Sequence, residues 1–261
     1  MSLERSSISR GIVAGIAAAA IAGVVGLADT ASAGTIYEDS FSRTGPLNAS
    51  TPSPTDTNSE TWAAGTAIST ATTSGGYASI TGTSNSMAYL PFSPVQGNIY
   101  TLTASLNPTP GTTTNWLAIG FFPQGSSTVS SAPNADASVM LLERDNRGSQ
   151  VFNGDGTSVD GPTSPNNPGP TTWSITLNTT QPDWTVNFSE VGVPDETNFQ
   201  TFIYGGSTPN PTINTVGFGA FGMSGTVQDF TLTSAVPEPT TLGLMGIGSI
   251  GLLLLKRREA F

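Results

Sequence analysis

Apolar and polar residues alternate along much of the chain. Residues 100–106, 173–177 and 184–188 each place apolar side chains at every second position, with Thr, Ser or Asn between them. A period of two predicts a β-strand with one buried face. Residues 115–122 and 137–144 are more continuously apolar, which is typical of the central strands of a sandwich.

Further strands are expected around 37–41, 61–68, 77–81, 87–92, 150–152, 201–204, 215–221 and 226–233. Gly and Pro recur every few residues, and no long window carries the spacing of an amphipathic helix. The pattern predicts an all-β domain, two packed antiparallel sheets in a jelly roll. Residues 145–148 (Asp-Asn-Arg-Gly) predict a hairpin turn, and the Pro-rich stretches 45–60 and 153–172 predict surface loops.

The N-terminus has the pattern of a secretory signal peptide. Arg5 and Arg10 precede an apolar run over residues 12–28, and Ala31 and Ala33 stand at the small-x-small positions that signal peptidase recognises. We expect residues 1–33 to form a signal helix that is removed, so that the mature chain begins near Gly34. An uncleaved membrane anchor is the alternative.

The charge of the remaining body, residues 34–235, excludes one class of partner. It contains three arginines, Arg43, Arg144 and Arg147, against 14 acidic residues and no lysine, a net charge of −11. Such a surface repels phosphate backbones, so nucleic-acid binding is excluded. The chain has no Cys and no His, which removes thiol catalysis, the Ser-His-Asp triad and the usual zinc ligands.

The C-terminus, residues 236–261, has three parts in a fixed order: Val236, Pro237, Glu238 and Pro239, an apolar segment over 242–255, and the basic residues Lys256, Arg257 and Arg258. This arrangement resembles the PEP-CTERM sorting signal of exopolysaccharide-producing Gram-negative bacteria. The resemblance implies cleavage by an exosortase and delivery to the cell envelope, cell surface or extracellular matrix. The apolar segment would form a helix that crosses the inner membrane transiently, with the basic tail in the cytoplasm. A permanent C-terminal anchor is the alternative.

Both ends of the body also resemble a known fold. Residues 37–64, with an Asp-x-Phe strand, a Pro-Leu turn and a Trp strand, resemble the first strands of concanavalin A-like, laminin-G-like sandwiches. Residues 213–235 resemble the last two strands of the same domains. The resemblance implies a concanavalin A-like β-sandwich over residues 34–235.

Three roles remain open for this domain. A non-catalytic structural or adhesive role in a biofilm matrix is the first, and a carbohydrate-binding module that contacts exopolysaccharide is the second. Of the four tryptophans, Trp173 and Trp184 are expected in the core and Trp116 begins a buried-looking strand, so Trp62 is the candidate for stacking on a sugar. A glycoside hydrolase is the third, but Glu143 and Asp145 form only half of a Glu-x-Asp-x-Glu motif, because Arg147 replaces the second Glu. We therefore expect no catalytic residues.

A structural Ca²⁺ is expected where the first and last strands meet. Sandwiches of the resembling superfamily often place these strands side by side, and here they carry Asp39 and Asp229. Carboxylate oxygens are the ligands that calcium prefers, and an exported protein meets millimolar calcium. The alternative is that both carboxylates are solvated or cap turns.

Overall fold

The computed structural model describes residues 33–56, 59–65, 67–70, 76–81, 85–109, 115–123, 134–146, 148–163 and 169–237. The predicted signal helix, residues Glu238 and Pro239, the apolar segment over 242–255 and the basic residues Lys256, Arg257 and Arg258 lie outside these ranges. Within the described ranges, no helix is both long and apolar enough to span a bilayer. Residues 33–236 form one compact unit.

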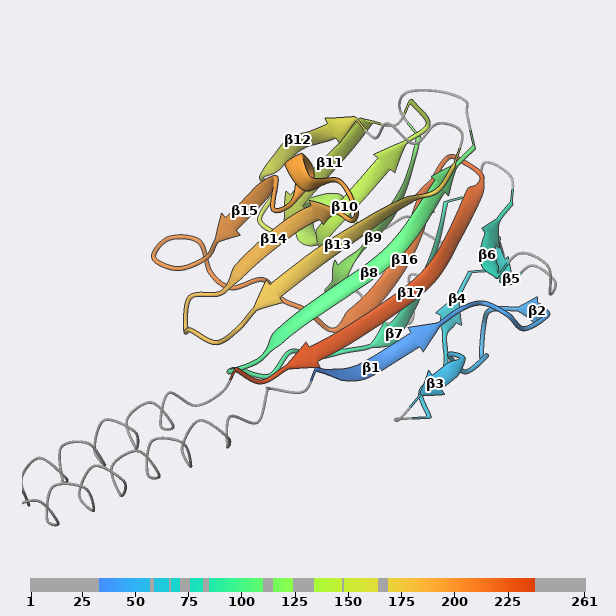
Figure 1. Cartoon of the computed structure of the whole chain (residues 1–261), viewed down its shortest axis with the longest axis horizontal. Coiled ribbons are helices and arrows are strands. Elements are labelled where there is room, and N and C mark those ends of the chain that lie inside the picture. Colours follow the sequence, from blue (N-terminus) through green and yellow to red (C-terminus); the bar gives the residue numbers. More distant parts are fainter. Residues whose placement is uncertain are drawn as a thin grey trace, which may run out of the picture. The chain divides into compact units, whose positions relative to one another are not determined.

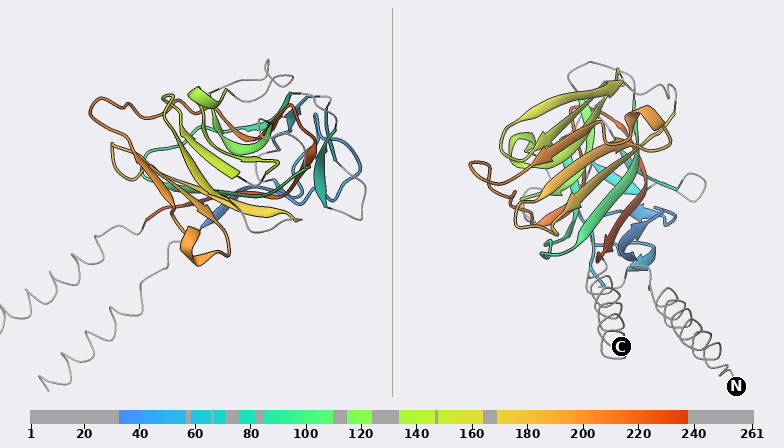
Figure 2. Two further views of the ribbon diagram at one scale, coloured as in Figure 1. Left: turned by 90° about the horizontal axis from the view of Figure 1, so that it is seen from above. Right: turned by 60° about the vertical axis from the view of Figure 1, so that its left-hand side comes forward.

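This unit is a sandwich of two antiparallel sheets, as the period-two pattern predicted (Figure 1). One sheet has ten strands: β1 (Gly34–Asp39), β2 (Gly45–Pro46), β3 (Pro54–Asp56), β5 (Ile68–Thr70), β6 (Tyr77–Ile80), β8 (Ile99–Pro108), β13 (Thr171–Asn178), β14 (Thr185–Glu190), β15 (Gln200–Ile203) and β17 (Gly225–Ala235). The other sheet has seven: β4 (Ala63–Ala64), β7 (Ser86–Pro91), β9 (Trp116–Phe122), β10 (Val139–Arg144), β11 (Gly148–Asn153), β12 (Ser158–Thr163) and β16 (Thr215–Phe221). Figure 2 shows the sheets as two facing layers. The only helical elements among the described residues are two short 3₁₀ turns, η2 (Ala135–Ala137) and η3 (Pro194–Glu196).

The last strand, β17, organises the ten-stranded sheet. It pairs with β8 along its length, with β6 through its first half and with β1 through its second half. The change of partner coincides with a register shift between Gln228 and Thr231, where Asp229 adopts a positive φ of 50°. A left-handed residue of this kind is typical of a β-bulge, and Asp is one of the few side chains that tolerate it.

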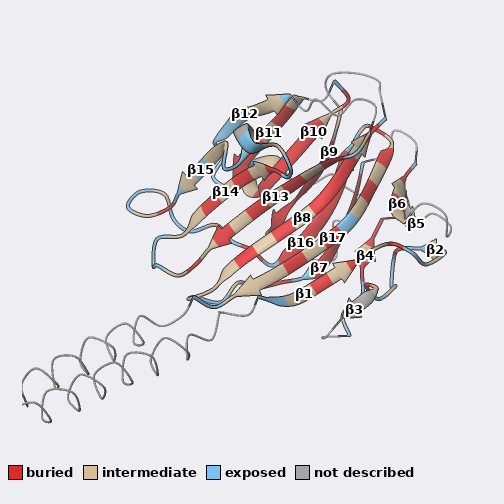
Figure 3. Cartoon of the chain, viewed as in Figure 1, coloured by how far each residue is buried: buried red, intermediate tan, exposed pale blue. Residues whose placement is uncertain are grey.

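The main core lies between the sheets and follows the alternation in the sequence. In β13, buried Trp173, Ile175 and Leu177 alternate with half-buried neighbours, and β8 repeats the pattern with Leu102 and Leu106 (Figure 3). These predicted strands are confirmed. Each large buried side chain contributes roughly 1.5–3 kcal/mol relative to an exposed position.

The central strands of the seven-stranded sheet are buried on both faces, which explains why their sequences are continuously apolar: β7, β9, β10 and β16. In β10, Val139 and Leu141 face the other sheet, whereas Met140 and Leu142 join a separate cluster on the outer face. This outer cluster also contains Met87, Tyr89, Ala118, Phe122 and Phe152. Strands covered on two sides have no polar face, so they lose the period of two.

The two stretches predicted as loops contain short strands. Residues 45–60 include β2 and β3, and residues 153–172 include β12 at the edge of the seven-stranded sheet. The prediction failed at β12 because an edge strand buries little side-chain area and therefore keeps a polar composition. A Cβ on Gly161 in β12 would lie 2.9 Å from the Phe199 ring, so a glycine lets this edge approach the ten-stranded sheet.

The first strand, β1, pairs with the last strand, β17, so that the start of β1 lies beside the end of β17. Gly34 in β1 lies opposite Ser234 in β17, and Tyr37 lies opposite Leu232. Gly34, near which the mature chain is predicted to begin, therefore lies beside Ser234, two residues before the Val-Pro-Glu-Pro motif.

A buried tyrosine links the two sheets near the edges formed by β15 and β12. Tyr204, directly after β15, donates a hydrogen bond from its hydroxyl to the Asn153 carbonyl of β11 at 2.7 Å. Burial raises the pKa of this hydroxyl well above its ordinary value of 10.0, and the charge of Asp155 raises it further. The neutral form is therefore strongly favoured in the folded state.

We predict an alkaline loss of stability that depends on Tyr204. Folding raises the pKa of the Tyr204 hydroxyl, so this residue adds to the free energy of unfolding below pH 10, where the hydroxyl is neutral in the unfolded chain as well. That added stability decreases as the pH rises from 10 toward the folded-state pKa. Urea unfolding at pH 8 and at pH 11 should show a smaller decrease in the free energy of unfolding for Tyr204→Phe than for the native chain. Equal decreases would contradict this assignment.

Candidate functional site

Asp39, one of the two predicted calcium ligands, is a fully buried carboxylate at the end of β1. Its Oδ1 accepts hydrogen bonds from the Phe41 backbone N–H at 2.8 Å and from Arg43 Nη1 at 2.7 Å. Its Oδ2 accepts hydrogen bonds from Arg43 Nη2 at 2.6 Å and from Trp62 Nε1 at 2.7 Å. Both oxygens are thus occupied, and Arg43 supplies the charge that balances them in a bidentate ion pair.

The structure places Trp62 in the core, which corrects its assignment as the sugar-stacking residue. Its side chain is 1 % exposed, and its ring contacts Phe218 and Phe230 at centroid distances of 5.3 Å and 5.1 Å. Phe41 completes this group at 6.2 Å from Trp62. The ring faces are covered by other aromatic residues, so none is open to a sugar.

Asp229 does not join Asp39 to form a site. It lies at the bulge of β17 with an exposed side chain, whereas Asp39 points into the core. Among the described residues, no three acidic side chains are grouped so that they could hold a metal. The geometry gives the calcium hypothesis no support from this pair, and calcium binding by the domain stays a prediction.

Glu143 and Asp145, the two carboxylates that match part of a hydrolase motif, are both buried. Glu143 in β10 is fully buried, and its Oε2 accepts a hydrogen bond from Trp173 Nε1 of the opposite sheet at 2.9 Å. Thr171 donates to its Oε1 at 3.3 Å. Asp145 follows in the β10–β11 turn and is also buried, and its carboxylate oxygens have no hydrogen-bond partner among the described residues. Glu143 therefore links the two sheets and does not line an open surface.

A pair of aromatic residues on the outer face of the seven-stranded sheet is the most open aromatic feature of the described residues. Trp116 in β9 lies opposite Phe221 in β16, and their rings are nearly parallel, with centroids 5.7 Å apart and an interplanar angle of 18°. Phe221 is 42 % exposed, and Trp116 is half-buried. Sequence reasoning missed this pair because the two residues lie far apart in the chain and only the β9–β16 register brings them together.

The C-terminal motif begins directly after the folded domain. Strand β17 ends at Ala235, and Val236, which is 59 % exposed, and Pro237 are the last described residues. Residues 235–258 match the model of the PEP-CTERM protein-sorting motif. The chain thus carries a PEP-CTERM sorting signal, which confirms this part of the sequence prediction and implies an exported protein that is processed by an exosortase.

The sandwich is similar to lectin-like and glucanase folds. An endo-1,3-β-glucanase from Streptomyces sioyaensis has a TM-score of 0.50 at 13 % identity, over 78 % of this chain and 97 % of that one. Arcelin-5, a lectin-like defence protein from Phaseolus vulgaris, has a TM-score of 0.46 at 11 % identity, over 78 % and 99 %. A comparison with curated protein sequences gave no match. The expected concanavalin A-like sandwich is confirmed, and at these identities the similarity concerns the fold alone.

We predict that Asp39→Asn destabilises the domain strongly. The amide cannot balance the Arg43 charge, and its NH₂ group would face the Arg43 and Trp62 donors in a buried position. Breaking a buried ion pair costs on the order of 3 kcal/mol, which chemical denaturation would measure. Asp229→Asn is the matched control, because Asn tolerates positive φ and the side chain is exposed, so we expect a change within about 0.5 kcal/mol. Equal effects of the two substitutions would contradict the central role of Asp39.

Proposed function

We propose that this protein is a non-catalytic surface or matrix component with a structural or adhesive role, delivered to the cell envelope or extracellular matrix after both ends are processed. The observation that carries the proposal is the sorting motif, which matches over residues 235–258 and begins at the last residue of β17. Signal peptidase and exosortase are the implied partners, with transient contact to the inner membrane.

The orientation of the carboxylates supports a non-catalytic role. A retaining glycosidase needs two carboxyl groups about 5 Å apart on either side of a bound sugar. Glu143 instead accepts hydrogen bonds from Thr171 and Trp173 between the sheets. The chain contains no His or Cys that could act as a base or nucleophile in its place.

A carbohydrate-binding module is the second candidate function, and the Trp116–Phe221 pair favours it. Sugars present apolar C–H faces that stack on aromatic rings, and a near-parallel ring pair, with Phe221 exposed and Trp116 half-buried, offers such a surface. Binding of exopolysaccharide through this face would give the protein its adhesive role.

We predict that the mature protein lacks about the first 33 residues and everything beyond the Pro-Glu-Pro site. Intact-mass measurement of the protein from its native host would show both cleavages. If most molecules kept Lys256, Arg257 and Arg258, the segment over 242–255 would be a permanent anchor and the processing proposal would fail.

We also predict that the domain does not cleave β-glucans, because neither Glu143 nor Asp145 is placed on an open face. Reducing-end assays on β-1,3- and β-1,4-glucans should match buffer alone. Reproducible hydrolysis that disappears in Glu143→Gln would overturn the non-catalytic assignment, provided that the variant keeps the circular dichroism spectrum of the native chain.

A further inference from the structure

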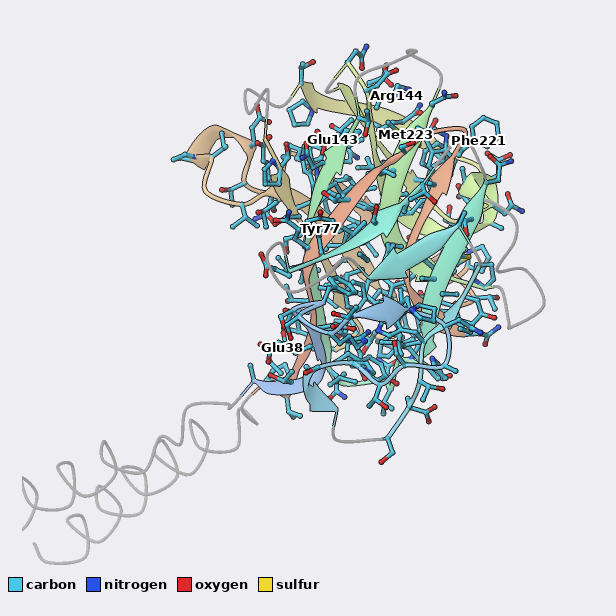
Figure 4. All side chains as sticks on the ribbon, turned by 90° about the vertical axis from the view of Figure 1, so that its right-hand side faces the viewer. Glu38, Tyr77, Glu143, Arg144, Phe221 and Met223 are labelled. Carbon is cyan, nitrogen blue, oxygen red and sulfur yellow. The ribbon has the colours of Figure 1, made fainter. Side chains whose placement is uncertain are left out.

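Three side chains form a row across the outer face of the seven-stranded sheet. Arg144 in β10 lies opposite Trp116 in β9, and Trp116 lies opposite Phe221 in β16. Directly opposed residues on neighbouring strands project to the same face of a sheet. Trp116 packs against the outer cluster, which contains Met140 and Leu142, so Arg144 shares that face while Glu143 points inward. Figure 4 labels Arg144 and Phe221 at the same end of the sandwich.

The ring pair is held in place by the turn that follows it. Asn115, next to Trp116, donates a hydrogen bond from Nδ2 to the Gly222 carbonyl at 2.7 Å, and the Gly222 N–H donates to Asn85 Oδ1 at 2.9 Å. Gly222 has a φ of 66°, and a Cβ there would lie 2.7 Å from Asn115 Oδ1. The residue after Phe221 is thereby fixed to the residue before Trp116. A surface organised in this way loses little conformational entropy when it binds a ligand.

The charge of Arg144 indicates which ligand this row suits. Of the three arginines in the body, Arg43 is paired with Asp39 and Arg147 lies outside the described residues. Arg144 donates from Nη2 to the neutral Gln150 Oε1 at 2.7 Å and makes no ion pair with a described carboxylate. Asp160 in β12 lies opposite Gln150 on the same face, one strand farther from Arg144, and makes no ion pair with Arg144. A guanidinium that pairs with no described carboxylate, beside an exposed aromatic ring, suits an anionic group of a ligand.

We infer that this row binds an acidic saccharide, with a sugar ring against Trp116 and Phe221 and the carboxylate of a uronate unit on the Arg144 guanidinium. The planar guanidinium can donate two parallel hydrogen bonds to a carboxylate. The inference rests on the second candidate function and names its ligand class. It does not require the sorting motif or any catalytic step.

Tetragalacturonate and its methyl ester test this inference, because the two oligosaccharides share their ring faces and differ in charge. Isothermal titration of the exported protein, purified from host cells, should show at least about tenfold weaker binding of the ester, because the ester lacks the charge that strengthens the hydrogen bonds from Arg144. Arg144→Gln should weaken binding of the acid about tenfold and leave the ester unchanged. Phe221→Ala should weaken both. Ile203→Ala, which removes a 71 % exposed side chain from the edge strand β15, is the matched control and should change neither.

The remaining outcomes separate the inference from the function on which it rests. Equal affinity for acid and ester, with both weakened by Phe221→Ala, would overturn the acidic ligand and keep a neutral glycan site. Failure of both ligands, and of a panel of neutral glycans, to bind the folded protein would overturn the carbohydrate-binding function itself. Binding that survives both Arg144→Gln and Phe221→Ala would place the site elsewhere and overturn the inference.

Discussion

The buried carboxylate of Asp39 is the interaction on which the arrangement of the N-terminal third depends. A charge removed from water is costly unless hydrogen bonds and an opposite charge replace the solvent, and here Arg43, Trp62 and the backbone of Phe41 do so. Trp62 directly precedes β4 of the seven-stranded sheet, whereas Asp39 ends β1 of the ten-stranded sheet. One carboxylate thereby fixes how the first strand of one sheet meets the edge of the other.

A second constraint is that the central strands of the seven-stranded sheet are buried on both faces. Its centre is apolar on either face, so the accessible side chains of the outer face lie toward the ends of the strands, where Trp116 begins β9, Arg144 ends β10 and Phe221 ends β16. The antiparallel order of these strands brings the three ends to one level. The core that stabilises the sheet therefore also determines where a ligand could approach it.

The period of two predicted strands correctly where one face of the strand is buried, as in β8 and β13. It did not predict the exposed edge strand β12. The strands that carry Leu102 and Ile175 and the Asp145 hairpin turn could be read from the sequence, because their signals are local. The burial of Trp62 was not predicted, and neither was the partial exposure of Trp116 at the start of the buried strand β9, because each tryptophan stands at a strand boundary and its exposure depends on register with distant strands. The hydrogen bond between Trp62 and Asp39 could not be predicted from local sequence either, because the two residues are 23 positions apart.

The pairing of the first strand with the last has a consequence for the time course of folding. Synthesis proceeds from the N-terminus, yet β1, β6 and β8 all pair with β17, and β17 ends one residue before the exposed Val236. Contacts between such distant segments are slow to form and cannot form before both are present. The ten-stranded sheet thus cannot close until Ala235 has been synthesised, and the sorting motif follows directly after the strand that completes the sheet.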